Sequence, residues 1–148
     1  MNIRPMTKED VDGVWQVEKQ CFSHPWSKAS FEEEMGLSYA VYVVAEEEGQ
    51  IVGYGGMHVL VDEGDVTNIA TLPDYQRRGI GRAMVEALVN WCKTHGMVRL
   101  MLEVRERNLP ARKLYESLGF TQDGRRKGYY DGPKEDAILM SRETTENA

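Results

Sequence analysis

The sequence predicts an α/β fold, and three observations carry this prediction. Tyr39–Ala45 and Ile51–Val61 have the composition of two antiparallel strands joined by a turn of glutamates and glycine. Val66–Leu72 is rich in β-branched residues, which indicates a buried strand, and a glycine-rich turn then opens a long helix over Gly79–His95. Val98–Val104 alternates apolar with polar side chains, as a strand with one buried face does, and a second helical pattern follows.

The chain begins with a strand and a helix. Asn2–Met6 is predicted to be a short strand, and Thr7 with Asp10 three residues later has the spacing of a helix cap. The helix behind this cap is predicted to run for about four turns. Its apolar face is expected to be centred on Val14 and Trp15 and to belong to the core.

A loop and a second, short helix come next. Ser27 is predicted to cap this helix, which extends through Phe31. Trp26 lies in the loop between the two helices, and we expect it either to fasten the loop to the core or to form a wall of a substrate groove. The run Glu32–Glu34 has the composition of a solvated face, and a further hypothesis is that it attracts a basic substrate peptide.

Glycines mark several features of the middle of the chain. Gly53, Gly55 and Gly56 inside a predicted strand indicate a bulge or the close approach of another backbone or a ligand. Glu63–Asp65 is predicted to turn into the strand Val66–Leu72. The long helix is predicted to stop before a glycine, and residues three or four apart form its apolar face, namely Ile80, Met84, Leu88, Trp91 and His95.

The C-terminal part is predicted to hold one helix and two strands. Asn108 begins the helix, Pro110 lies in its first turn where proline is tolerated, and Gly119 ends it. Phe120–Arg125 and Ala137–Ser141 are predicted to be a strand pair. The connection Arg126–Asp136 is expected to be a mobile loop, because it is rich in glycine, lysine and tyrosine, and residues 143–148 are expected to be a disordered tail.

Composition restricts the function classes. The 148 residues fit a single domain, 1–148, and a net charge of −6 with a pI of about 5.1 argues against direct nucleic-acid binding and favours a cationic partner. Cys21 and Cys92 lack the spacing of a redox or metal motif and are expected to be free thiols. The three histidines are scattered, which argues against a metal site. The sequence shows no membrane span or signal peptide, so a soluble, cytoplasmic protein is expected.

The segment Gln76–Arg82 is predicted to bind phosphate or pyrophosphate. It lies between a strand and a helix start, where backbone N–H groups are unpaired and the helix dipole is positive. Gly79 and Gly81 allow a ligand to approach closely, and positive charge comes from Arg77, Arg78 and Arg82. A dinucleotide fingerprint would need glycine where Met84 stands, and the lysine and hydroxyl residue of a P-loop are absent.

The pattern Gln/Arg-x-x-Gly-x-Gly in this segment resembles the acetyl-CoA loop of the GNAT family of N-acetyltransferases. Leu102–Asn108 (L-E-V-R-E-R-N), Ala111–Phe120 (A-R-K-L-Y-E-S-L-G-F), the His24–Ser27 loop and the opening I-R-P-M extend the resemblance over nearly the whole chain, to bacterial ribosomal-protein-alanine N-acetyltransferases within that family. The resemblance implies a twisted, mixed sheet of about six to seven strands flanked by about four helices. Acetyl-CoA would lie in a cleft where two parallel strands, Val66–Leu72 and Val98–Val104, splay apart.

The resemblance also implies a role for individual residues. The strand end formed by Ile69, Ala70 and Thr71 would pair with the pantetheine arm, and Asn108 would bind near the thiol end. Tyr115 would protonate the departing thiolate, and Glu103 would take the proton from the amine. The backbone N–H groups that would hold the pyrophosphate belong to Arg77, Arg78, Gly79, Ile80, Gly81 and Arg82.

The acceptor implied by the resemblance is the N-terminal alanine of a small-subunit ribosomal protein, attacked directly in a ternary complex. Making an amine neutral at pH 7 costs roughly 1 kcal/mol for an N-terminus and over about 4 kcal/mol for a lysine, which favours the N-terminus. A lysine side chain or a small amine stays an alternative acceptor, and a non-catalytic module that senses acetyl-CoA is an alternative of another class. No oligomeric state is predicted.

Overall fold

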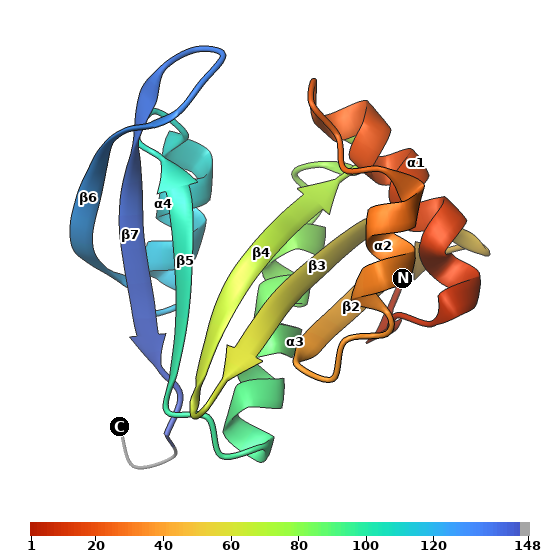
Figure 1. Cartoon of the computed structure of the whole chain (residues 1–148), viewed down its shortest axis with the longest axis horizontal. Helices are drawn as coiled ribbons and strands as arrows, with labels where there is room; N and C mark the ends of the chain where they lie inside the picture. The colour runs from red at the N-terminus through yellow and green to blue at the C-terminus, as the bar shows by residue number, and fades with distance from the viewer. Residues whose placement is uncertain (146–148) are drawn as a thin grey trace.

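The computed structural model describes residues 1–145, which contain one seven-stranded sheet and four α-helices (Figure 1). The strands are β1 (Asn2–Pro5), β2 (Ala40–Glu47), β3 (Gln50–Leu60), β4 (Glu63–Thr71), β5 (Arg99–Arg105), β6 (Thr121–Tyr130) and β7 (Glu135–Glu143). The helices are α1 (Val11–Cys21), α2 (Lys28–Glu34), α3 (Ile80–Thr94) and α4 (Leu109–Ser117). The strand order is β1-β2-β3-β4-β5-β7-β6, and all neighbours are antiparallel except β4 and β5. The predicted mixed α/β fold is confirmed.

Helices cover both faces of the sheet (Figure 1). On one face α1 packs so closely on β3 that a Cβ atom added to Gly13 would lie 2.9 Å from Ile51. On the other face, a Cβ atom added to Gly55 would lie 3.7 Å from Leu88 of α3. Glycine at position 13 lowers helix propensity, and this close contact explains why a larger side chain would not fit there.

The central strands β4 and β5 pair over a short distance only. Their parallel register joins Glu63, Gly64 and Asp65 to Arg99, Leu100 and Met101, and it extends no further. Beyond these pairs the two strands diverge into the V that Figure 1 shows. The splayed parallel strands implied by the resemblance are therefore present. The predicted turn at Glu63–Asp65 is wrong, because these residues pair with strands on both sides and the turn falls earlier, at Val61–Asp62.

The core lies between the sheet and the helices, and it corrects two predicted helix faces. On α3 the buried residues are Ile80, Met84, Val85, Leu88, Val89 and Cys92. Trp91 is half-buried and packs against the core, whereas His95, the C-cap residue just past the end of α3, is exposed and stacks on the Trp91 ring at 3.8 Å. On α1 the fully buried positions include Val14, Val17 and Glu18, whereas Trp15 is half-buried beneath Lys19.

The predicted helix starts and the glycine features of β3 are confirmed. Ser27 Oγ accepts from the Ser30 backbone N–H at 3.1 Å, and Asp10 Oδ2 accepts from the Thr7 N–H at 2.8 Å. The register of β3 shifts after Gly56, at the predicted bulge, and a Cβ atom there would lie 2.2 Å from the Tyr42 ring. Close packing by an aromatic neighbour thus requires glycine at that position.

The expected mobile loop over residues 126–136 is instead an ordered hairpin. Strand β6 continues to Tyr130 and β7 begins at Glu135. Asp136 accepts from the Gly128 N–H at 2.8 Å and pairs with Arg125 at 2.8 Å, while Glu135 pairs with Arg105 of β5 at 3.2 Å. These contacts pair backbone and charged groups of the hairpin that its composition alone had suggested would face solvent.

The chain end is also more ordered than expected. Glu143 is the last residue of β7, and Thr144 is 1% exposed. The Thr144 N–H donates to Val98 O at 2.9 Å and its hydroxyl donates to Met97 O at 2.7 Å. These bonds fasten residues 143–144 to the start of β5, and residues 146–148 of the expected tail lie outside the described residues.

Candidate active site

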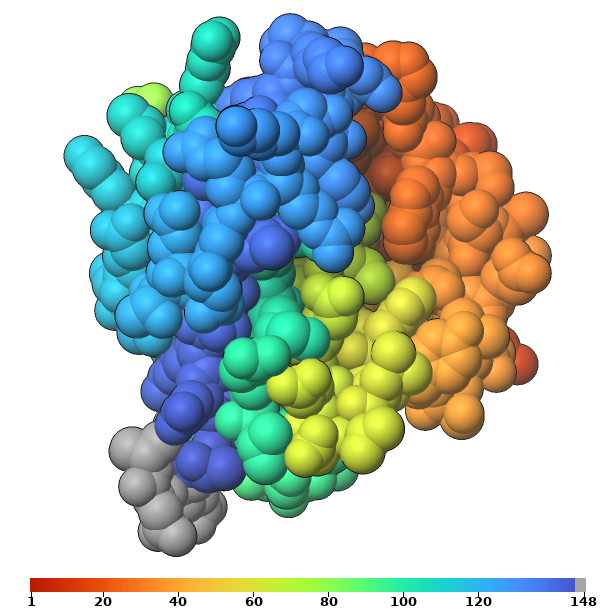
Figure 2. Space-filling view, turned by 60° about the vertical axis from the view of Figure 1, so that its left-hand side comes forward, coloured from red at the N-terminus to blue at the C-terminus, as the bar shows by residue number. Residues whose placement is uncertain are grey.

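A cleft of about 1140 Å³ occupies the opening between β4 and β5. Its walls come from the loop between α1 and α2, from β4 and β5, from α4 and from the β6–β7 hairpin. Figure 2 shows the hollow between the hairpin, in blue, and the α1–α2 segment, in orange. Four predicted site residues line it together. Ile69 comes from β4, Glu103 from β5, Asn108 from the N-cap of α4 and Tyr115 from α4 itself.

The backbone of β4 presents alternate residues to the cleft. Leu72 N–H donates to Val52 O of β3 at 2.9 Å, and the antiparallel register pairs Ala70 with Tyr54. In such a ladder every second residue bonds to the same neighbour, so Ala70 is turned toward β3. Ile69 and Thr71 therefore turn their backbone groups to the cleft side, whereas Ala70 does not.

The glycine loop lies outside the lining of the cleft, where β4 ends and α3 begins. Gly79 has a φ of +81° in the left-handed region, which glycine adopts without strain. The first hydrogen bond of the helix runs from the Ala83 N–H to Gly79 O, at 3.0 Å. The N–H groups of residues 80–82 have no acceptor within the described chain. They form a helix start with unpaired N–H groups, which is the feature on which the predicted anion site depends.

The three loop arginines have different surroundings. Arg78 donates to Asp74 O at 3.0 Å, and Arg82 donates to Ser117 Oγ of α4 at 3.0 Å. Arg77 is exposed, has a φ of +65°, and makes no side-chain hydrogen bond to any residue in 1–145. Arg77 is therefore the loop cation whose guanidinium is not already engaged by the protein.

Asn108 lies at the start of α4 and lines the cleft. Its Oδ1 accepts from the Ala111 N–H at 3.3 Å, which caps the helix as predicted. The side-chain amide nitrogen makes no hydrogen bond to residues of the described chain and is the group left to bind a ligand in the cleft. The capping bond fixes the direction in which this amide points.

Tyr115 is 9% exposed and packs edge-on against Phe120, with ring centroids 5.8 Å apart. Burial raises the pKa of the Tyr115 hydroxyl to about 12. The hydroxyl is therefore protonated at neutral pH and can donate a proton to a developing anion in the cleft.

Glu103 supplies negative charge to the same cleft from β5. Its side chain is 26% exposed, and its Oε1 lies 3.9 Å from Arg126 Nη2. A hydrogen bond to Glu103 raises the pKa of Tyr129. Desolvation, with the charge of Glu103 as a second cause, raises the pKa of Asp65. This part of the cleft is thus an acidic environment suited to a cationic amine.

Sequence reasoning missed several lining residues, namely Glu18, Asn68, Tyr129 and Tyr130. Glu18 carried a usable signal, since it is a glutamate at a buried position of an otherwise apolar helix face. Trp26 fulfils both of its expectations, because its ring lies 5.4 Å from Phe31 and it also lines the cleft.

The glutamate run is only partly a solvated face. Glu32 and Glu33 are exposed, as expected. Glu34 instead has a side chain only 12% exposed, and its Oε1 lies 2.6 Å from both the Tyr42 hydroxyl and His58 Nε2. Glu34 is thus engaged inside the protein and is not available to attract a peptide.

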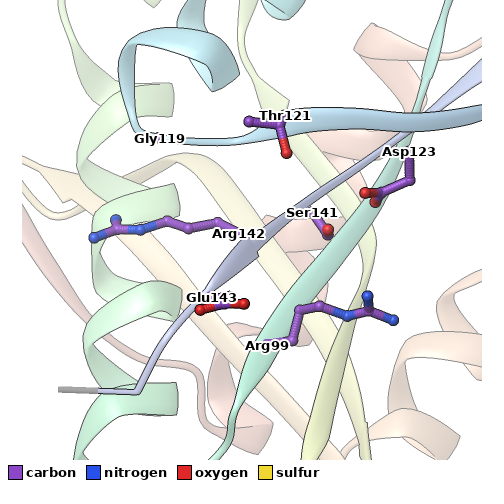
Figure 3. A pocket seen from close by; sticks show the side chains of 7 residues that line it. All are labelled: Arg99, Gly119, Thr121, Asp123, Ser141, Arg142 and Glu143. Carbon is purple, nitrogen blue, oxygen red and sulfur yellow. The ribbon is translucent and has the colours of Figure 1, made fainter. Parts of the chain in front are cut away.

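A second hollow, of about 480 Å³, lies on the β5–β7–β6 part of the sheet and contains none of the predicted site residues. Figure 3 shows that the guanidinium groups of Arg99 and Arg142 point away from each other. Arg99 is already paired with Glu63 at 3.1 Å. These side chains do not converge on a common ligand, so the chemistry is assigned to the cleft between β4 and β5.

Within residues 1–145, no three His, Cys, Asp or Glu side chains are grouped so that they could hold a metal ion. None of the described helices is long and apolar enough to span a bilayer. Cys21 and Cys92 are free thiols, as expected.

Known proteins share both the sequence and the fold. A relative from Escherichia coli K12, the [ribosomal protein bS18]-alanine N-acetyltransferase, is 37% identical over 142 residues, which cover 94% of this chain and 95% of the relative. A Bacillus subtilis relative, to which the same activity is provisionally assigned, is 40% identical over 139 residues, covering 93% of this chain and 92% of the relative. The crystal structure of the Escherichia coli ribosomal-protein-S18-alanine N-acetyltransferase superposes with a TM-score of 0.90 at 35% identity, covering 99% of this chain and 97% of that one.

The family model of the GNAT acetyltransferases matches residues 11–120. The match includes the glycine loop, both splayed strands and the helix that carries Tyr115. This chain belongs to the GNAT family of acetyltransferases.

Proposed function

We propose that this enzyme transfers the acetyl group of acetyl-CoA to the N-terminal alanine of ribosomal protein bS18. The observation that carries the proposal is the convergence of Glu103, Asn108 and Tyr115 in the cleft where β4 leaves β5. A base and a protonated phenol can transfer the two protons of amine acetylation by a thioester, and an amide donor can hold the thioester between them. Two relatives whose matches cover 92% and 94% of the chain are named for this acceptor.

The cleft and the glycine loop together fit acetyl-CoA. The free N–H groups of residues 80–82 would bind the pyrophosphate, with Arg77 nearby to add charge. The outward backbone groups of Ile69 and the N–H group of Thr71 would pair with the pantetheine arm, as a neighbouring strand would. The Thr71 carbonyl already accepts from Gln76 Nε2 at 3.2 Å and from Cys21 Sγ at 3.3 Å. The amide nitrogen of Asn108 would bind close to the thioester. Acetyl-CoA supplies the activated acetyl group, and the residues of this chain supply its alignment.

The proposed reaction needs one proton acceptor and one proton donor. The amine nitrogen forms a bond to the carbonyl carbon while the carbon–sulfur bond breaks. Glu103 takes the proton that the nitrogen loses, directly or through water, and Tyr115 gives a proton to the departing sulfur. The products are an acetylated amide and the free thiol of CoA.

A thiol of the enzyme is a poor candidate for a covalent intermediate. Burial raises the pKa of Cys92 to about 11 and is the main cause that raises the pKa of Cys21. Neither thiol lines the cleft. Direct attack by the amine therefore accounts for the transfer better than a relay through cysteine.

The α-amino group is favoured over lysine because it is easier to deprotonate. An α-amine titrates at about 7.7–8.0 and a lysine at about 10.4, so a carboxylate base meets a smaller free-energy cost with the former. With a ribosomal protein as its acceptor, the enzyme would act in the cytoplasm.

The acceptor is tested with synthetic peptides and mass spectrometry. One peptide carries the bS18 N-terminus beginning with alanine, and a matched peptide carries the same sequence with a blocked N-terminus and its lysines free. We expect one acetyl group on the α-nitrogen of the first peptide and none on the second. Acetylation of both peptides, or of lysine alone, would overturn the proposed acceptor.

A further inference from the structure

Glu18 of α1 is a buried carboxylate in the cleft wall to which the reaction above assigns no role. The residue is 2% exposed and lines the cleft beside Trp26 and Asn68. Within residues 1–145 no Lys, Arg or His side chain lies within 4.0 Å of its carboxylate. A buried carboxylate without a counter-charge is costly, so its hydrogen bonds must account for its presence.

Two donors hold this carboxylate. Its Oε1 accepts from the Tyr54 hydroxyl at 2.5 Å, and its Oε2 accepts from the Trp26 backbone N–H at 2.9 Å. The Tyr54 hydroxyl in turn accepts from Asn68 Nδ2 of β4 at 2.8 Å. The carboxylate therefore joins the loop between α1 and α2 to the two strands β3 and β4.

Aromatic rings complete the same connection. The ring of Trp26 lies 5.4 Å from Phe31, and Phe31 meets the Tyr54 ring edge-on at 5.5 Å. Glu18, Trp26, Phe31 and Tyr54 thus form a closed ring of contacts. The ring packing fixes the side chain of Trp26, whereas the bond to Glu18 is the contact that fixes its backbone.

We propose that Glu18 is a positioning residue that holds the acceptor wall of the cleft in place. The wall consists of Phe22, Ser23, His24 and Trp26, which line the same cleft as Glu103 and Tyr115. The inference rests on the proposed function, since it assigns this wall to the acceptor peptide. It predicts that Glu18 affects the KM for the peptide and leaves the KM for acetyl-CoA unchanged, because the glycine loop lies outside this ring.

Three substitutions distinguish whether Glu18 acts through the length of its side chain or through its negative charge. Glu18→Gln keeps the length of the side chain and one oxygen that can accept from Trp26 N–H, but removes the charge. Glu18→Asp keeps the charge but withdraws the carboxylate by one methylene group. Glu18→Met keeps the approximate length and removes both acceptors. The matched control is Asp12→Asn, a loss of charge on the exposed face of the same helix.

The experiment measures kcat and KM for the bS18 peptide and for acetyl-CoA in all five proteins. Leaving one buried N–H donor without its acceptor corresponds to about a tenfold change. We expect Glu18→Asp and Glu18→Met to raise the peptide KM about tenfold. Glu18→Gln should have a peptide KM close to that of the parent. The acetyl-CoA KM should be the same in all variants. Asp12→Asn should match the parent.

Two outcomes would overturn the role of Glu18. If Glu18→Asp behaved like the parent while Glu18→Gln raised the peptide KM, charge and not reach would be required. If all three variants matched the parent, Glu18 would have no part in the acceptor site. Glu18→Asp keeps the test valid if Glu18→Met does not fold. Failure of the parent itself to acetylate the peptide would contradict the proposed function and would be recognised before any variant is compared.

Discussion

Asp65 of β4 and Met101 of β5 form the last pair of the parallel ladder at the centre of the sheet. Every strand neighbour other than β4 and β5 is antiparallel. Past this pair the strands separate, so Ile69 and Glu103 line the two sides of an open cleft instead of bonding to each other. The early end of one ladder thus leaves strand backbone free for a ligand in the middle of the molecule.

Tyr115→Phe tests the proton donor. The change removes the hydroxyl and keeps the ring against Phe120, so the fold should be preserved. We expect kcat to fall by about 10²–10⁴-fold, with the Kd for acetyl-CoA changed less than about twofold. Steady-state kinetics and calorimetry measure the two quantities. Tyr39→Phe, at an exposed tyrosine outside the cleft, is the control. A Tyr115→Phe enzyme with parental kcat would remove Tyr115 from the reaction.

The raised pKa of Tyr115 also predicts a pH profile. Its hydroxyl has an ordinary pKa of 10.0 that burial raises to about 12, so it stays protonated as pH rises through 10. The parent should therefore retain kcat between pH 8 and about pH 10, where an ordinary phenol would begin to ionise. A kcat that has declined by half at pH 10, in a protein still folded by circular dichroism, would contradict this assignment.

Glu103→Gln tests the proton acceptor through its pH dependence. At pH 6 the peptide α-amine is protonated and needs a base, whereas at pH 9 it is largely neutral in solution. We expect kcat/KM to fall about a hundredfold at pH 6 and the deficit to shrink as pH rises to 9. Glu63→Gln, at the closed end of the same strands, is the control and should match the parent. A deficit that stays constant with pH would exclude Glu103 as the base.

Gly79→Ala and Gly49→Ala form a matched pair that tests the glycine loop. Both glycines have a φ of +81°, and at both sites an added Cβ would meet no atom within 4 Å. Each alanine should therefore lower the free energy of unfolding by about 1–2 kcal/mol through backbone strain alone. Only Gly79→Ala should also weaken acetyl-CoA binding, because Gly49 lies in the distant β2–β3 turn. Equal Kd values for the two variants would place the pyrophosphate elsewhere.

Asp10→Asn tests the stability of the N-terminal contact with Arg4. The Asp10 carboxylate accepts from Arg4 at 2.8 and 2.9 Å, and these bonds lower the pKa of Asp10 from 3.8 to about 2. Because the folded pKa is depressed, the contribution of about 2 kcal/mol is present above pH 4 and is lost as pH falls toward 2. Denaturant unfolding of parent and variant should therefore differ at pH 7 and converge near pH 2. A difference that persists unchanged at pH 2 would show that charge is not its source.

Local signals in the sequence were sufficient for most elements. The helix starts at Ser27 and Asn108 depend on residues within three positions of the cap, so they could be predicted directly. The glycine loop combined a strand, a turn and a helix start in a single segment of the chain. The proposed catalytic pair, Glu103 and Tyr115, depends on family resemblance, since neither residue differs by its local pattern from a structural glutamate or tyrosine.

Features that depend on distant partners could not be predicted in the same way. Composition alone suggested a loop after Arg125. The segment is an ordered hairpin because Arg125 of β6 forms an ion pair with Asp136 of the neighbouring strand β7. The burial of Glu18 depends on Tyr54, which lies 36 residues away. Likewise, Glu34 differs from its neighbours Glu32 and Glu33 because its carboxylate contacts His58 of β3. Each correction concerns a polar side chain whose partner is brought near only by the fold.

Hydrogen exchange at three consecutive amides of β4 tests most directly whether acetyl-CoA occupies the cleft between β4 and β5. Ile69 and Thr71 turn their backbone to the cleft, whereas Ala70 bonds to β3 with or without a ligand. Nuclear magnetic resonance of the protein with saturating acetyl-CoA should show exchange slowed at least about tenfold at Ile69 and Thr71, with Ala70 unchanged. Bound acetyl-CoA that leaves the Ile69 and Thr71 amides exchanging at their unliganded rates would contradict the account.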